Sequence, residues 1–224
     1  MELDIDSVNG GIDVYSWGGD EIKWEMEIKA KGNTNKEAEA RLDEFQYDLS
    51  NELVAGVQEV SMSFPLALSE WRNYAVGMEI YIPESLESDI IISTTNGEIW
   101  VNDIICTILD VETTNGVIRG TISTTESTMK TTNGAIDISL TQTSSVHDFK
   151  TTNGLVELNV PTGNDIGYAV SFDTSIGALD INLPDMGYSL DTARSKIGKT
   201  SDYTGKSIQI QIKAQTTIGG IKVN

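Results

Sequence analysis

A four-residue phrase, Thr-Thr-Asn-Gly, occurs four times between residues 94 and 154 of this chain. The repeats are 19, 18 and 20 residues long, and the copies end at Gly97, Gly116, Gly134 and Gly154. Degenerate copies end at Gly177, Gly198 and Gly219, and an eighth copy opens the chain at Ser7–Gly10. Self-similarity at a nearly fixed period of this length indicates a solenoid in which each repeat contributes one rung.

Apolar residues alternate with polar ones on both sides of each copy, which is typical of strands with one buried face. Ile136, Ile138 and Leu140 follow one copy. The column that precedes the copies is apolar throughout and consists of Ile92, Val111, Met129, Phe149 and Phe172. Two short strands cannot bury their own inner face, but rungs stacked at ~4.8 Å share one core. We therefore predict an all-β fold, a right-handed parallel β-helix or solenoid of about eight short rungs.

The repeated phrase is expected to form the corner between two strands, because Asn and Gly accept the positive φ of a sharp turn. By parity, the first Thr and the Asn of each copy point inward. Stacked rungs would then form an amide ladder of Asn96, Asn115, Asn133 and Asn153. Ile176, Ile197 and Ile218 continue this column. We interpret these motif residues as structural.

The 224 residues are expected to form a single domain, with residues 1–14 as the first rung and residues 89–224 as the remaining rungs. Residues 15–88 form an insertion with strands near 22–28, 60–64 and 74–82. A capping box at Thr34–Glu37 predicts a helix near 35–50. Such an insertion at the end of a solenoid is expected to cap its exposed strand edges. Regular alternation is lost near 195–203.

The chain is strongly acidic, with 34 Asp and Glu against 15 Lys and Arg and a net charge of −19. It lacks the basic excess that binding to nucleic acid or directly to an anionic membrane requires. Residues 1–89 alone carry 20 acidic and 6 basic side chains, a net charge of −14. The repeats are therefore much closer to neutral than the first part of the chain.

The arrangement of these segments resembles a known family. The opening Ser7–Val14, the helix-bearing insertion, the segment Met78–Pro83 and the serial Thr-Thr-Asn-Gly rungs are similar to the putative adhesin family of bacteria and archaea. The resemblance covers essentially the whole chain. It implies a β-helical domain that is often associated with the cell envelope, with no catalytic residue or cofactor to carry over.

Catalytic chemistry finds little support in the sequence. His147 is the only histidine, and its inward parity indicates a buried structural residue rather than a general base. Cys106, the only cysteine, lies in an apolar run, so we expect a buried and unreactive thiol. We predict no catalytic residue, no cofactor and no enzymatic activity.

The outward column three residues after each glycine holds the residues that could recognise a ligand. In chain order it reads Trp100, Arg119, Asp137, Glu157, Asp180 and Lys222. Trp100 and Arg119 suit a cation–π contact and are the predicted recognition residues. Arg119 and Asp137 suit an exposed ion pair. Asp137, Glu157 and Asp180 place three carboxylates at successive rungs. They make a weak candidate metal site for calcium.

Other exposed side chains offer alternative surfaces. Trp17 and Trp71 are expected to be exposed, and Trp24 is expected in the core. A threonine array could face ice or a flat carbohydrate, but charges in the neighbouring column interrupt its plane. That array consists of Thr95, Thr114, Thr132 and Thr152.

We predict a non-catalytic, cell-envelope adhesin-like or scaffold domain whose ligand is an unknown protein or glycan. The alternatives are a glycan-active β-helix enzyme or carbohydrate-binding module, and an intracellular regulatory or assembly module. A cell-envelope or extracellular location is expected if a targeting segment precedes Met1, and a cytoplasmic one otherwise. Homo-oligomerisation is expected through the C-terminal rung around Ile208–Ile212.

Overall fold

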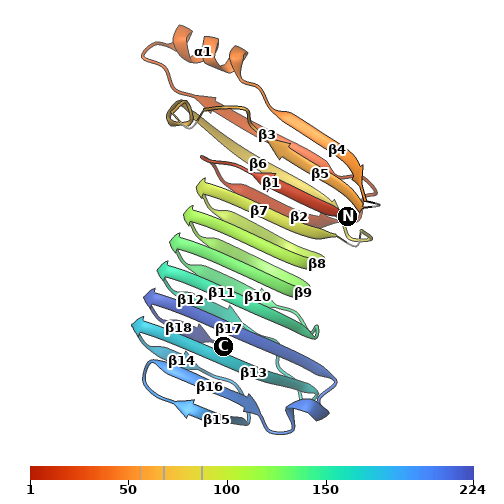
Figure 1. The fold of residues 1–224 in the computed structure, drawn as a ribbon, viewed down its shortest axis with the longest axis vertical. Coiled ribbons are helices and arrows are strands. Elements are labelled where there is room, and N and C mark those ends of the chain that lie inside the picture. The colour runs from red at the N-terminus through yellow and green to blue at the C-terminus, as the bar shows by residue number, and fades with distance from the viewer. Residues whose placement is uncertain (56, 68, 87) are drawn as a thin grey trace.

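The computed structural model describes residues 1–55, 57–67, 69–86 and 88–224, and strands make up most of it (Figure 1). The strands are β1 Glu2–Asp6, β2 Ile12–Trp17, β3 Lys23–Ala30, β4 Asp48–Val54, β5 Val57–Ser63, β6 Tyr74–Pro83, β7 Asp89–Asn96, β8 Ile99–Asn115, β9 Ile118–Asn133, β10 Ile136–Leu140, β11 Ser145–Asn153, β12 Val156–Asn159, β13 Ile166–Ile176, β14 Leu179–Ile181, β15 Met186–Asp191, β16 Ser195–Thr200, β17 Ile208–Ile218 and β18 Ile221–Val223. The helical segments are α1 Asn35–Glu44, η1 Trp71–Asn73 and η2 Tyr203–Gly205. The predicted all-β class is confirmed.

The strands pair in two series that stack along the long axis of the molecule (Figure 1). The first series runs β4-β5-β1-β7-β8-β9-β11-β17-β13-β16-β15, and the second runs β3-β6-β2-β8-β9-β10-β12-β18-β14. The long strands β8 and β9 contribute to both series. Pairing is parallel except at the two ends, where β4, β3, β16 and β15 pair antiparallel.

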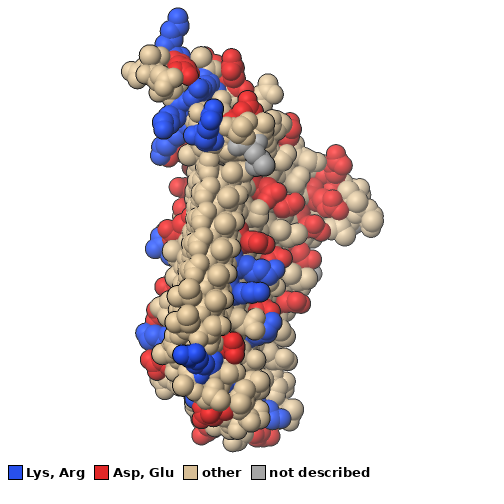
Figure 2. Space-filling model, turned by 60° about the vertical axis from the view of Figure 1, so that its left-hand side comes forward, with Lys and Arg blue, Asp and Glu red and all other residues tan. Residues whose placement is uncertain are grey.

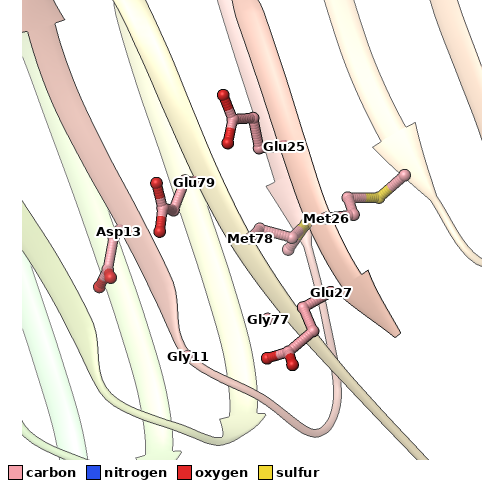
Figure 3. A pocket seen from close by; sticks show the side chains of 8 residues that line it. All are labelled: Gly11, Asp13, Glu25, Met26, Glu27, Gly77, Met78 and Glu79. Atoms are coloured by element: carbon pink, nitrogen blue, oxygen red, sulfur yellow. The ribbon is translucent and has the colours of Figure 1, made fainter. Parts of the chain in front are cut away.

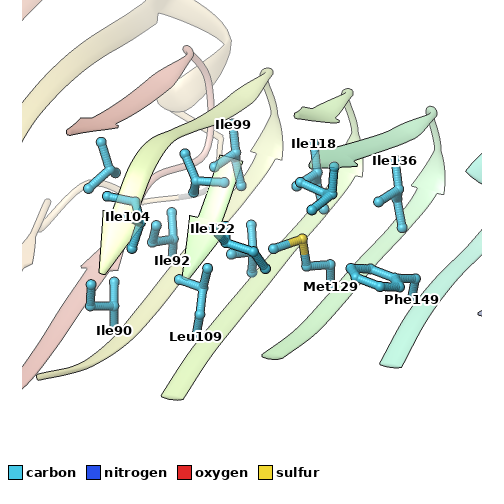
Figure 4. Packing of buried hydrophobic residues seen from close by; sticks show 14 of the residues in the cluster. Ile90, Ile92, Ile99, Ile104, Leu109, Ile118, Ile122, Met129, Ile136 and Phe149 are labelled. Atoms are coloured by element: carbon cyan, nitrogen blue, oxygen red, sulfur yellow. The ribbon is translucent and has the colours of Figure 1, made fainter. Parts of the chain in front are cut away.

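The core lies between the two series. Figure 4 shows Ile99, Ile118 and Ile136 of the second series facing Ile92, Met129 and Phe149 of the first. These six side chains are at most 1 % exposed. One continuous cluster of buried apolar residues runs through the stack, so each rung buries its inner face against its neighbours.

The order of the rungs in space departs from their order in the chain. The C-terminal pair β17–β18 lies between β11–β12 and β13–β14, with parallel pairing on both sides. The expectation that Ile208–Ile212 forms a weakly protected terminal edge is therefore wrong, because β17 is an interior strand. The edges at this end are β14 and β15, each paired on one side only among the described residues.

Of the eight predicted copies of the repeat, seven form corners in the described part of the chain. Residues 195–198 do not form a corner, because β16 is a straight strand that pairs antiparallel with β13 and β15. Ile197 lies opposite Ser171 within this sheet and is 43 % exposed, so it does not continue the asparagine column. The loss of alternation noted near 195–203 coincides with this change of direction.

The first threonine of each corner points inward, as predicted. The threonines at positions 94, 113, 131, 151, 174 and 216 are at most 5 % exposed. From position 113 onward, each hydroxyl donates a hydrogen bond of 2.8–3.1 Å to the carbonyl of the corner glycine in a neighbouring rung. These bonds satisfy buried hydroxyls and tie successive rungs together.

The asparagine ladder is confirmed, but its predicted inward orientation is wrong. The amide of Asn96 donates to Asn9 at 2.8 Å, and the bonds continue at 2.8–2.9 Å through Asn115, Asn133 and Asn153. These four side chains are exposed. The chain bends between the second Thr and the Gly, which interrupts strict alternation, so both the second Thr and the Asn face solvent.

The corner glycines are required for a reason other than the predicted positive φ. Of the seven, only Gly10 and Gly219 have a φ in the left-handed range. At the six corners from Gly97 onward, a Cβ atom would lie 1.7–1.8 Å from the carbonyl oxygen of the neighbouring corner glycine. The rungs thus stack so closely at the corner that no side chain fits there.

The insertion occupies one end of the stack (Figure 1). Helix α1 begins after the N-cap Thr34, whose hydroxyl accepts from the Glu37 amide at 3.2 Å. It ends at Glu44, earlier than predicted, because residues 48–54 form β4. Strands β5 and β6 extend the two series parallel to β1 and β2. The capping role of this insertion stays a prediction.

Candidate recognition surface

The outer face of the second series carries one column of polar and aromatic side chains along nearly its whole length. In spatial order this column is Glu25, Glu79, Asp13, Trp100, Arg119, Asp137, Glu157, Lys222 and Asp180. It begins with three carboxylates from three separate segments of the insertion and first rung. The remainder alternates more evenly in charge.

Trp100 and Arg119 are in contact, as predicted. The guanidinium carbon lies 4.7 Å from the centroid of the indole ring, which is a cation–π arrangement. The predicted ion pair with Asp137 does not form, because Arg119 pairs with Glu98 instead. Asp137 lies beside Arg119 in register without a direct ion pair between them.

The candidate metal site is not assembled. Lys222 of the inserted C-terminal rung lies between Glu157 and Asp180, and its ammonium group is 2.7 Å from Glu157. This lysine lowers the pKa of the Glu157 carboxyl. Within the described part of the chain, no group of three potential ligands is close enough to hold a metal ion. The three like charges expected at consecutive rungs are thus separated by a cation.

A hollow of about 320 Å³ opens at the acidic end of the column (Figure 3). Gly11 and Gly77 lie at its base, where side chains are lacking. The carboxylates around it belong to Asp13, Glu25, Glu27 and Glu79. We call this feature the acidic hollow. This hollow was not predicted from the sequence, although the alternation of Glu25 and Glu27 with the apolar residues of β3 indicated that both point outward.

Asp13 is the carboxyl in the acidic hollow whose pKa is raised. Partial burial is the main cause, and the negative charges of Glu79 and Glu98 add to it. The positive charge of Arg119 opposes the shift. Asp13 therefore holds its proton more readily than an ordinary surface aspartate.

Three aromatic rings adjoin the acidic hollow. Tyr15 and Tyr81 are stacked with their centroids 5.1 Å apart, and Trp17 meets Tyr81 edge-on at 6.0 Å. The Tyr81 hydroxyl donates to Glu79 at 2.9 Å, and this bond contributes most to raising the Tyr81 pKa to about 12. All three rings are partly exposed. We call them the aromatic cluster. Their mutual contacts restrict their rotation, so they present a largely fixed aromatic surface beside carboxylates, with the Lys23 ammonium 5.0 Å from the centroid of the Tyr81 ring.

The other two tryptophans lie elsewhere. Trp71 was expected to be exposed, but it is 4 % exposed and packs edge-on against Phe64 at 5.6 Å. Its backbone carbonyl accepts the amide of Asn9, which anchors the end of the asparagine ladder. Trp24 is partly buried against the core, as expected.

His147 is a buried structural residue, as predicted. It is 2 % exposed, and its two ring nitrogens lie 2.7 Å from the Ser127 hydroxyl and 2.8 Å from that of Ser145. Burial lowers its pKa to about 4. A neutral imidazole whose two nitrogens are both occupied is not arranged to act as a base on an external substrate.

The Cys106 thiol is buried, with an exposed fraction of 8 %. Burial, together with the charge of Asp89, raises its pKa to about 12. We therefore expect the native protein to react with a disulfide reagent at about pH 8 far more slowly than the unfolded protein, whose thiol pKa is ~8.5. The rate at which the reagent releases its own thiolate, compared in the absence and presence of guanidinium chloride, measures the reactivity of Cys106. Equal rates would contradict the burial of Cys106.

The threonine array is exposed at positions 95, 114, 132 and 152, next to the outward asparagines. Together they form an uncharged strip along the corners. Figure 2 shows such a strip along the long axis, bordered by charged side chains. The structure places two uncharged columns side by side here, where the sequence analysis placed only one.

Two crystal structures resemble this chain. A protein from Clostridium sporogenes, described as a putative cell adhesion protein, has a TM-score of 0.59 and 17 % identity over 99 % of this chain and 92 % of its own. A putative adhesin from Bacteroides fragilis has a TM-score of 0.36 and 10 % identity over 99 % of this chain and 91 % of its own. No family model and no curated protein sequence matches. At this identity the first likeness shows a shared fold, and this chain therefore has the fold of a protein described as a putative cell adhesion protein.

Proposed function

We propose that the rungs wind as a right-handed β-solenoid, and that this scaffold is a non-catalytic, adhesin-like recognition domain displayed at the cell envelope. The shared fold with the Clostridium protein supports this role. A stack of hydrogen-bonded rungs holds its outward columns at fixed spacing and so presents a preorganised surface. No helix in the described residues is long and apolar enough to cross a membrane.

We propose that the ligand is a glycan, and the aromatic cluster is the observation that supports this choice. Sugar rings have apolar faces that stack on aromatic rings and hydroxyls that donate to carboxylates. Tyr15, Tyr81 and Trp17 offer the first kind of contact, and Asp13 and Glu79 offer the second. Such a mixture of rigid aromatic surface and a few polar groups is usual in binding sites.

Binding of the purified domain to a glycan array tests this proposal. We expect Tyr81→Ala and Trp17→Ala each to weaken binding at least about tenfold, because aromatic anchors dominate binding energy. Tyr47→Ala is the matched control, since Tyr47 is 49 % exposed and lies outside the cluster. Equal losses in all three variants, or no binding to any glycan, would overturn the choice of ligand.

The same assay separates recognition from catalysis. Among the surface carboxyls beside the aromatic cluster, Asp13 is the one whose pKa is raised, which is the direction that favours a general acid. Cleavage of a bound glycan that Asp13→Asn abolishes would support the glycan-active enzyme instead. Binding without release of reducing sugar is the expected result.

A further inference from the structure

A second hollow, of about 510 Å³, lies on the outer face of the first series near its C-terminal end. Strand β13 forms its floor with Ala169 and Ser171, two residues with short side chains. Gln211 and Lys213 of β17 lie beside them on one side, and Lys199 and Ile197 of β16 on the other. We call this feature the β13 groove. It arises because a strand with short outward side chains lies between two strands with long ones.

The surface of the β13 groove is mainly apolar. Val146 and Ile197 contribute to its lining and are 48 % and 43 % exposed. Gly187 on β15 and Gly198 on β16 also line the groove and have no side chain to cover it. Exposed apolar surface in a concave site of this volume is typical of a small-molecule site.

The charge around the β13 groove is opposite to that of the chain. Two charged side chains are among the lining residues of the groove in the described part of the chain, and both are lysines, Lys199 and Lys213, whereas the whole chain has a net charge of −19. Lys213 pairs with Asp148 at 2.9 Å. Lys199 lies between Ala169 and Gly187 in register, and no carboxylate of the described residues pairs with it. A cation without a partner beside apolar surface favours an anionic group on the ligand.

We propose that the β13 groove binds a small amphipathic anion, an apolar chain or ring system that carries one carboxylate. The apolar body would cover Ala169 and Ser171 between Val146 and Ile197, and the carboxylate would pair with Lys199. This site lies on a different sheet face from the aromatic cluster and does not depend on the proposed glycan binding.

Fluorescence titration with anilinonaphthalene sulfonate, an apolar anion, tests the proposal on the intact domain. We expect saturable binding of one probe per chain and its displacement by dodecanoate, but not by dodecyltrimethylammonium. Lys199→Glu should weaken binding about tenfold or more, the effect of one ion pair at a partly apolar site. Lys150→Glu is the control, because it makes the same charge change on β11 outside the groove.

Three outcomes would overturn the proposal. Equal weakening by both lysine variants would mean that only net charge matters. Displacement by the cationic detergent as readily as by dodecanoate would mean that the apolar surface alone binds. Tighter competition by an apolar peptide with a free C-terminus than by dodecanoate would assign the groove to a peptide. Ala169→Leu, which fills the floor, should abolish binding while the melting temperature remains close to that of the wild type.

Discussion

Gly134→Ala is expected to destabilise the domain by at least about 3 kcal/mol, because the added methyl group overlaps backbone rather than a movable side chain. Its Cβ would lie 1.8 Å from the carbonyl oxygen of Gly116. Relief requires the two rungs to separate at the corner. This separation strains the hydrogen bond that the Thr131 hydroxyl donates to that carbonyl and the hydrogen bond that the Asn133 side-chain amide donates to Asn115. Urea denaturation followed by circular dichroism measures the change.

Gly77→Ala is the matched control for this prediction. Gly77 also lies in a strand that is paired on both sides, but the nearest atom to its added Cβ is the Glu27 carbonyl oxygen at 4.0 Å. We expect the control to be neutral or slightly stabilising, since alanine lowers the entropy of the unfolded chain. A comparable loss of stability in both variants would show that stacking space does not explain the corner glycines.

The inner face of the rungs was predictable because apolar and polar residues alternate along a strand that has one buried face. It placed the inward threonines and the apolar columns correctly. The same counting failed at Asn96, Asn115, Asn133 and Asn153, because it assumed that alternation continues through the corner. A bend changes the direction of the following side chain, and the sequence carries no direct signal for where within Thr-Thr-Asn-Gly the bend occurs.

The position of the C-terminal rung was not predictable from repeat spacing, since every rung offers the same register to its neighbours. The charged residues of the outward columns did indicate where this rung belongs. In chain order, Glu157 would lie next to Asp180, which is unfavourable for like charges. Inserting the last rung places Lys222 between them and Lys213 beside Asp148.

The acidic hollow depends on a pairing that the sequence leaves open. Glu25, Glu79 and Asp13 come from three strands, of which β3 runs antiparallel to β6 and β6 parallel to β2. Alternation predicts that each carboxylate faces outward, but not which strands are neighbours. The aromatic cluster was missed for the same reason, because Tyr15 and Tyr81 meet only once β2 and β6 are paired.

His147 is expected to make the stability of this domain depend on pH between about 6.5 and 4. Burial lowers its pKa from the ordinary 6.5 to about 4, and the imidazole is neutral in the native state. In this range the unfolded chain binds a proton that the folded chain does not. The contribution of His147 is therefore fully present above pH 6.5 and is lost as the pH falls towards 4, by up to roughly 3 kcal/mol.

His147→Gln isolates this effect, because glutamine retains a donor and an acceptor for Ser127 and Ser145 but does not titrate. We expect the variant to be less stable than the wild type at neutral pH, since an amide replaces a closely packed ring. The free energy of unfolding should then fall less steeply for the variant than for the wild type as the pH is lowered, measured by urea denaturation at a series of pH values. Parallel curves would mean that His147 titrates normally in the folded protein. Because this chain has one histidine, its single imidazole NMR signal reports the folded pKa directly and separates His147 from the carboxyls that titrate in the same range.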